Sequence, residues 1–214
     1  MIGDKIKSQM IANRLLTDVD DILLERYKLP EGCIDIGLFE TAFDAVGYCA
    51  ADDATKQANV EVTTIYSTYG GVGSCNNGHA FGVLTGPTVS DVERGLRYVR
   101  QYVENADGIV SISEDDSQWI YTDCISKIGK YFAKEFDLPM GSSIAFLMAP
   151  SLYGTYGLDA ALTDAHVEVV KFWDAPRESN LIGAIVTGTQ SQCKTACAAF
   201  ERGVMEVVEE PNEY

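Results

Sequence analysis

The sequence predicts an α+β fold made of two tandem copies of one domain, each an antiparallel sheet with flanking helices. One observation behind this prediction is an internal repeat, in which residues 50–62 return as residues 157–169 in a chain of 214. Another is a Leu-Pro-x-Gly motif at 29–32 that returns at 138–141. The repeat is longer than the roughly 20–50 residues of a solenoid unit, so each copy is expected to be a whole domain.

Each half is predicted to open with a long helix. Apolar residues at helical spacing predict helices over 8–28 and 118–137. Both end at the Leu-Pro-x-Gly motif, because proline and glycine disfavour a continuing helix. Strands are then expected at 33–40 and 143–149.

The remaining elements follow in the same order in both halves. A short helix begins with an aspartate, a residue that suits the first turn of a helix. Two strands joined by a connection come next, and this arrangement favours an antiparallel sheet with helices on one face. A second helix closes each half. The predicted ranges are 52–58, 59–67, 80–85 and 90–105 in the first half, and 159–165, 166–173, 181–187 and 191–208 in the second.

A polar stretch at 106–117 predicts a linker between the two copies. The expected domains are therefore residues 1–110 and residues 111–214. Each is close to the usual size of a small independent domain.

Composition excludes several classes of partner. The net charge of −16 disfavours binding to nucleic acid, because the phosphate backbone is also negative, and it disfavours docking on anionic membranes. No apolar run approaches the roughly 18–20 residues that span a bilayer. The chain begins without a signal-peptide pattern, so its six cysteines are expected to be reduced thiols in the cytoplasm.

Three stretches, residues 48–62, 149–162 and 186–197, resemble the L-type shell proteins of ethanolamine-utilisation bacterial microcompartments. The resemblance extends from about residue 29 to residue 208. It implies tandem, circularly permuted microcompartment domains and a homotrimer with a six-fold appearance. It also implies tiling with other shell proteins into the shell of a cytoplasmic compartment. A central pore that passes metabolites or cofactors and smaller pores that bind ethanolamine are further implications, as are the lack of enzymatic activity and of a required cofactor, with cobalamin as a ligand or as cargo.

The loops between the last two strands of each half are predicted to form the gate of the central pore. Closed cyclic symmetry turns equivalent loops toward one axis, and the glycines of the first loop permit alternative backbone conformations. Ordinary turn chemistry without a gating role is the alternative for such a loop. The predicted gate residues are Tyr69, Gly70, Gly71, Gly73, Asn76, Asn77, Trp173 and Arg177.

Four residues are predicted to bind ethanolamine from their match to the family. A cation that carries a hydroxyl needs a carboxylate and neutral hydrogen-bonding groups. Asp44 would supply the carboxylate, and Glu178, Ser179 and Asn180 would supply the rest. Backbone capping in a turn is the alternative role for Asp44.

No metal or catalytic site is predicted. Cys75 and His79 lie four residues apart, but two ligands on one loop are a weak metal signal. The sequence contains no phosphate-binding loop, dinucleotide fingerprint or nucleophile elbow. Two alternatives to a shell subunit stay open at this point: a soluble trimeric sensor of small molecules, and an enzyme that uses Asp44 with a histidine for acid–base chemistry.

Overall fold

The computed structural model describes residues 1–69, 78–175 and 178–212. Contacts within the chain divide it into two units. The N-terminal unit contains Lys7–Ala106 and Gly129–Glu135, and the C-terminal unit contains Met1–Ile6, Asp107–Ile128 and Phe136–Tyr214. The chain therefore passes from one unit to the other at residues 6, 106, 128 and 135 rather than at one linker.

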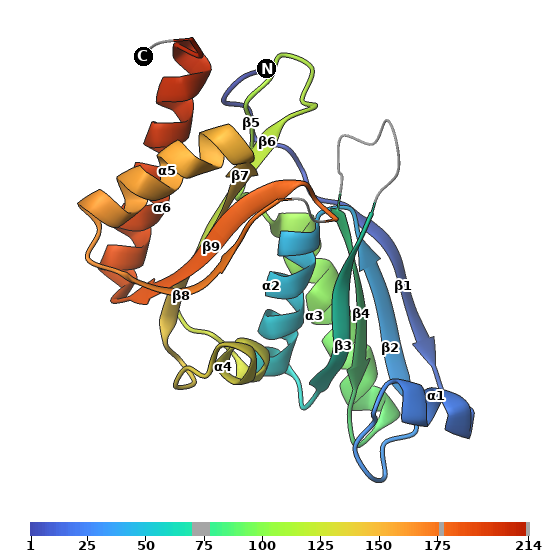
Figure 1. Ribbon diagram of the computed structural model, residues 1–214. Helices are drawn as coiled ribbons and strands as arrows, with labels where there is room; N and C mark the ends of the chain where they lie inside the picture. The colour runs from blue at the N-terminus through green and yellow to red at the C-terminus, as the bar shows by residue number, and fades with distance from the viewer. Residues whose placement is uncertain (70–77, 176–177, 213–214) are drawn as a thin grey trace. The chain divides into compact units, whose positions relative to one another are not determined.

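The N-terminal unit is built on an antiparallel sheet whose strands lie in the order β1-β2-β4-β3 among the described residues. Helices α2 and α3 lie on one face of this sheet (Figure 1). Side chains of the short helix α1 pack against a separate cluster that includes Val19, Ile36 and Val83. The elements are β1 (Met10–Leu16), α1 (Asp21–Arg26), β2 (Ile36–Thr41), α2 (Asp44–Gln57), β3 (Glu61–Tyr69), β4 (Gly78–Thr85) and α3 (Val89–Asn105).

The C-terminal unit contains a similar antiparallel sheet, with the order β5-β6-β7-β9-β8 among the described residues. Helices α5 and α6 cover one face and enclose a core that includes Leu147, Val186 and Phe200. Most of α4 is counted with the N-terminal unit. The elements are β5 (Ile109–Ser111), β6 (Trp119–Ile125), α4 (Lys130–Phe136), β7 (Ser143–Pro150), α5 (Ser151–Asp164), β8 (Glu168–Trp173), β9 (Leu181–Gly188) and α6 (Gln190–Glu209).

The predicted duplication is confirmed by the topology of the two sheets. The order β6-β7-β9-β8 repeats the order β1-β2-β4-β3, and β5 is an additional strand. Both edge strands shift register at matching places, between Val62 and Thr64 in β3 and between Val169 and Lys171 in β8. Two close approaches also match. A Cβ added at Gly47 of α2 would collide with Ala80 of β4, and one added at Gly154 of α5 would collide with Ile182 of β9. The two helices therefore approach their sheets closely at equivalent glycines.

The predicted helices over 8–28 and 118–137 are wrong. Each range contains a strand and then a short helix, namely β1 with α1 and β6 with α4. In β6 the apolar residues form a nearly continuous run because most of the strand is buried, and such a run also contains residues at helical spacing. The later strands and the closing helices are confirmed to within a few residues.

Two further predictions need correction. Helices α2 and α5 begin at Asp44 and Ser151, well before the predicted aspartates, because their first turns consist largely of small or apolar residues that show no polar boundary. The predicted linker at 106–117 contains β5, in which Ile109 and Ser111 are fully buried. This segment is part of a domain rather than a free connection.

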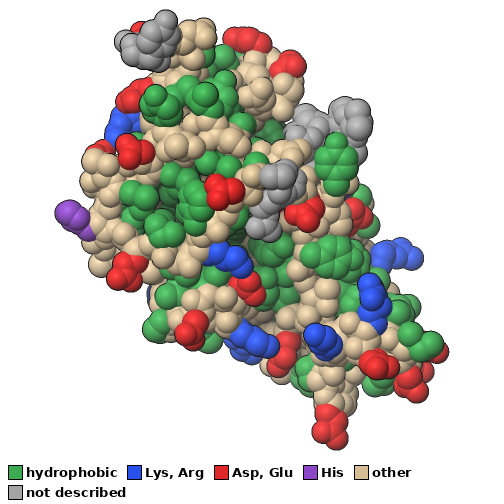
Figure 2. Space-filling view, viewed as in Figure 1, with side chains coloured by type: hydrophobic (Ala, Val, Ile, Leu, Met, Phe, Trp, Pro, Cys, Tyr) green, Lys and Arg blue, Asp and Glu red, His purple; other side chains and the backbone are tan. Residues whose placement is uncertain are grey.

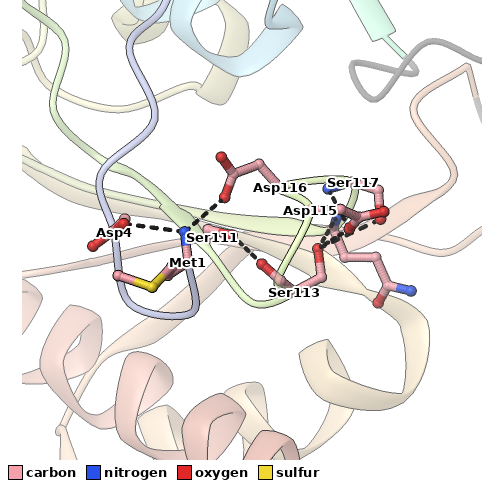
Figure 3. Close-up of polar contacts among 8 residues, drawn as sticks. Met1, Asp4, Ser111, Ser113, Asp115, Asp116 and Ser117 are labelled. Atoms are coloured by element: carbon pink, nitrogen blue, oxygen red, sulfur yellow. Dashed lines mark hydrogen bonds and ion pairs between the residues drawn. The ribbon is translucent and has the colours of Figure 1, made fainter.

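The first six residues extend the sheet of the C-terminal unit. The backbone of this segment exchanges hydrogen bonds with β5, from Gly3 N to Ser111 O and from Ile6 N to Ile109 O, both at 2.9 Å. The terminal ammonium group of Met1 lies 3.0 Å from Asp4 Oδ2 and 3.3 Å from Asp116 Oδ1 (Figure 3). The segment thereby covers an edge that would otherwise expose unpaired backbone groups.

The turn beside this terminus is held by its own hydrogen bonds. The carboxylate of Asp115 accepts a hydrogen bond from Ser113 Oγ at 2.9 Å and another from Ser117 N at 3.1 Å (Figure 3). Hydrogen bonds from the side chain and backbone of Ser117 and from the side chain of Ser113 stabilise the ionised form and lower the pKa of Asp115 to about 2.

Within the described ranges, no helix is long and apolar enough to cross a bilayer.

Candidate functional site

The first predicted gate segment connects β3 to β4, the hairpin at the edge of the N-terminal sheet. Tyr69 is the last described residue of β3, faces Gly78 in the strand register, and has a largely exposed side chain. The hairpin is therefore well defined up to its last strand pair. The predicted gate residues Gly70, Gly71, Gly73, Asn76 and Asn77, and the weak metal candidate Cys75, lie outside the described residues.

The second predicted gate segment connects β8 to β9, the matching hairpin of the C-terminal unit. Trp173 ends β8, and its ring makes an edge-to-face contact with Phe146, with 5.5 Å between the ring centroids. A Cβ added at Gly183 would come within 2.7 Å of the Trp173 ring, so the absence of a side chain there makes room for the indole. Trp173 is thus packed on its own sheet. Arg177 lies outside the described residues.

The residues that follow Arg177 form the turn into β9. Glu178 and Asn180 are exposed, whereas Ser179 is buried. Asn180 has a φ of 55°, in the left-handed region where asparagine is enriched. This geometry directs the chain into β9 and leaves the carboxylate of Glu178 and the amide of Asn180 facing solvent.

Asp44, the predicted carboxylate ligand, stands in the first turn of α2 and is only 5% exposed. Its Oδ1 accepts a hydrogen bond from Ala45 N at 2.8 Å, and its Oδ2 accepts one from Ser67 Oγ of β3 at 2.9 Å. A negative charge is also favourable at the N-terminal end of a helix. Asp44 therefore joins the start of α2 to β3. It belongs to the N-terminal unit and residues 178–180 to the C-terminal unit, so no contact within a unit brings them together.

His79, the other weak metal candidate, lies beside a carboxylate. Its Nδ1 lies 3.5 Å from Glu40 Oε1, and its backbone carbonyl accepts a hydrogen bond from Thr68 Oγ1 at 3.4 Å. Among the described residues, no group of three or more histidine, cysteine, aspartate or glutamate side chains is arranged to hold a metal ion.

A buried polar site in the N-terminal unit was not predicted from the sequence. Asp52 lies in the middle of α2, is fully buried, and accepts hydrogen bonds from Gly129 N at 2.7 Å and Phe132 N at 2.9 Å. Thr55 Oγ1, one turn further on, accepts a hydrogen bond from Lys130 N at 2.9 Å. These donors are backbone groups at the start of α4, where a helix has no partners of its own for them.

The electrostatics of Asp52 reflect this burial. Desolvation raises the pKa of Asp52, and it outweighs the opposite effects of the backbone donors of Phe132 and Gly129 and of the ammonium group of Lys56. Lys56 Nζ lies 3.7 Å from Asp52 Oδ2 and 3.0 Å from Asp53 Oδ1. The cluster holds Gly129–Glu135 on α2, and the ring of Phe132 is buried with it.

One signal for this cap was present in the sequence. The first short helix carries its own cap, because Asp20 Oδ1 accepts a hydrogen bond from Ile22 N at 3.0 Å. Glycine occupies the equivalent position, residue 129, at the start of α4, and it has no side chain to serve as a cap. A missing cap in one copy of a repeat indicates that another element supplies it.

The cysteines of the C-terminal unit are weakly acidic thiols, of which Cys193 is buried and Cys124 and Cys197 are half-buried. Burial raises the pKa of Cys193 to about 11 and also raises the pKa values of Cys124 and Cys197. Thiols with raised pKa values carry little thiolate at neutral pH and are poor nucleophiles.

Comparison with known proteins identifies the class that this duplicated fold defines. The family model described as BMC domain matches residues 35–113. The chain is 36% identical to the bacterial microcompartment shell protein EutL of Clostridium perfringens, over 99% of both chains, and 34% identical to that of Escherichia coli, over 97% of this chain and 96% of the other. The crystal structure of the ethanolamine utilization protein EutL from Leptotrichia buccalis superimposes with a TM-score of 0.94 at 39% identity, over the full length of both chains.

The chain therefore belongs to the bacterial microcompartment shell proteins, a class of structural proteins. Within this class it belongs to the EutL family. The resemblance noted in the sequence is thereby confirmed for both the family and the tandem α+β fold.

The cap on α4 predicts a difference between two equivalent aspartates. We expect Asp52→Ala to lower the free energy of unfolding by about 2–4 kcal/mol, because it leaves buried backbone donors of Gly129 and Phe132 without an acceptor. Asp159 occupies the same place in α5 but is exposed, so Asp159→Ala is expected to change stability by no more than about 0.5 kcal/mol. Urea denaturation followed by circular dichroism measures both. Equal losses would contradict the assigned role of Asp52.

The raised pKa of Asp52 predicts a pH dependence of definite sign. A carboxyl group with a raised folded-state pKa contributes most below its unfolded-state value near 3.8, and this contribution is lost as pH rises through the folded-state pKa. The unfolding free energy of the wild type, relative to Asp52→Asn, is therefore expected to fall between pH 4 and pH 7. Urea titrations of both proteins at matched pH values test this. A difference that grows with pH would show that the backbone donors outweigh desolvation.

Proposed function

We propose that this shell protein assembles as a homotrimer whose six domains surround a gated central pore, and that the trimers tile edge to edge with other shell proteins. The observation that carries this proposal is the matching strand order of the two sheets. Three chains with two similar domains each can close into a ring with six nearly equivalent wedges. Such a ring places the equivalent hairpins β3–β4 and β8–β9 at repeated positions around one axis.

The gate in this proposal is formed by the two unlike hairpin connections. The first carries the glycines at positions 70, 71 and 73, whereas the second is anchored at its base by the contact of Trp173 with Phe146. Alternative backbone conformations are therefore expected mainly in the first loop. In this proposal small polar metabolites pass the pore, no cofactor is required, and cobalamin is a ligand or cargo that crosses when the pore is open. The compartment lies in the cytoplasm.

Ethanolamine is proposed as the ligand of the smaller pores, with Asp44 as the residue that pairs with its ammonium group. Asp44 is nearly buried and already accepts a hydrogen bond from Ser67. A carboxylate fixed in this way offers a preorganised partner to a small cation. Glu178, Ser179 and Asn180 are proposed to complete a site of this kind from the C-terminal unit. Regulation by ethanolamine requires that it bind one state of the gate more tightly than the other.

The shell proposal predicts assembly in two stages. We expect the purified protein to have about three times its 23.3 kDa chain mass in light scattering, and to form flat hexagonal sheets in electron micrographs at high concentration. The mass tests the trimer and the micrographs test the tiling. Discrete trimers that never form sheets would instead support a soluble sensor, and a stable monomer would contradict the proposal as a whole.

The ligand proposal predicts loss of ethanolamine binding in one variant. Asp44→Asn removes the charge while keeping a similar shape, and we expect at least a ten-fold weaker affinity by titration calorimetry, since charged hydrogen bonds contribute about 1.5–3 kcal/mol. Asp53→Asn on the same helix is the matched control and is expected to bind normally. Circular dichroism spectra check that both variants are folded. Unchanged affinity in Asp44→Asn would remove Asp44 from the site.

A further inference from the structure

One face of α5 is exposed although the equivalent face of α2 is buried. The offset of 107 residues that relates the two helices pairs four buried residues on one face of α2 with exposed residues of α5. Leu152 and Tyr156 are 58% and 56% exposed. Figure 2 shows hydrophobic side chains gathered over α5. The pairs, buried residue first, are Ala45 with Leu152, Cys49 with Tyr156, Asp52 with Asp159, and Thr55 with Leu162.

The segment that covers α2 is Gly129–Glu135, which contains most of α4. It is capped by Asp52 and Thr55, it buries Phe132, and it places the ring of Tyr131 6.5 Å from that of Tyr48. Apolar residues are exposed on this face of α5 and covered on the equivalent face of α2, so among the described residues of its own unit α5 has no equivalent cover.

The counterpart of α4 in the repeat is α1. Lys28 and Asp137 follow the two helices with φ values of 53° and 52°, and Gly32 and Gly141 follow with φ values of 83° and 85°. Each of these pairs is separated by 109 residues, as are the Leu-Pro-x-Gly motifs. Ile22, the equivalent of Tyr131, is 74% exposed. Helix α1 is therefore a matching element whose outer side carries an apolar residue in solvent.

We infer that the exposed face of α5 is covered by α1 of a second copy of this chain. In the N-terminal unit, an element of the second repeat covers α2 of the first repeat. In a ring of chains, the first repeat of the next chain follows the second repeat of this one. Its α1, the equivalent of α4, would then cover α5, the equivalent of α2. Each chain then offers one α1 and one α5 face, so the contact closes on itself after a fixed number of chains. The inference rests on the trimer proposed above and assigns residues to its subunit contact.

The proposed contact of α1 with α5 between chains differs in one respect from the contact of α4 with α2 within a chain. A Cβ at Gly129 would lie 2.5 Å from Thr55 Oγ1 and 2.6 Å from Asp52 O, so a side chain cannot be accommodated at that place. In α1 this position is Asp20, which caps its own helix, and Leu162 replaces Thr55. Helix α1 therefore sits further from α5 and meets it through apolar side chains. Asp159 is not needed as a cap and lies on the side that faces Asp20, so the two like charges repel.

Cross-linking tests the contact directly. Thr155 is the equivalent of Tyr48, so Ile22→Cys of one chain is expected near Thr155→Cys of the next. The double variant should form covalent dimers and trimers under mild oxidation on non-reducing gels. The single variants, which keep the native cysteines, and a control that combines Ile22→Cys with Val169→Cys on the exposed edge of β8, should not. If the double variant is a trimer in light scattering but gives no such bands, the inference is wrong although the trimer stands. A monomeric wild type would instead overturn the proposed assembly.

The like charges of Asp159 and Asp20 in the proposed contact give a second, independent test. Asp159→Asn removes one of the two like charges and is expected to lower the concentration at which the trimer dissociates by roughly two-fold or more in dilution experiments. A structural role without contact to α1 would leave this concentration unchanged. Unchanged or weaker association in Asp159→Asn would contradict the placement of α1 against α5.

Discussion

A carboxylate buried in helix α2 holds the start of a helix that lies 77 residues further along the chain. Isolated buried carboxylates are costly, and Asp52 is tolerated because backbone donors of α4 and the nearby ammonium group of Lys56 surround it. The segment Gly129–Glu135, whose start it caps, belongs to the N-terminal unit. Without this interaction, the first backbone N–H groups of α4 would lose their acceptor.

The two repeats have the same strand order in their sheets but differ in the outer faces of their helices. The equivalent helices α2 and α5 cross their sheets through matching glycines, Gly47 and Gly154. Their outer faces have diverged, because one is covered inside the chain and the other is not. Duplication followed by this kind of divergence allows a ring to alternate between two different contacts. In a ring of identical single domains, every contact would be the same.

Sequence reasoning predicted the duplication, the order of the later strands and the closing helices, because these depend on local patterns such as the repeated Leu-Pro-x-Gly motif. It failed for β1 and β6, since apolar residues at helical spacing also occur in strands, and only pairing with β2 and β7 shows that these segments are strands. It also started α2 too late, since Asp52 was interpreted as the first residue of a helix that begins at Asp44. The role of Asp52 depends on contacts across 77 and 80 residues, which no local pattern contains. Asp44 was predicted as a ligand from the family resemblance, and its contact with Ser67 is seen only in the fold.

The exchange of segments between the units has a consequence for synthesis on the ribosome. Residues 1–6 are made more than a hundred residues before β5, with which they pair, and the N-terminal unit lacks its cap until Gly129–Glu135 has left the exit tunnel. Neither half is thus complete when its own main stretch has emerged, and the usual order of one domain after another does not apply. In the nascent chain, residues 1–6 stay unpaired and the outer face of α2 stays uncovered until the later segments are made. A chain that ends before Gly129–Glu135 would therefore leave the N-terminal unit incomplete as well.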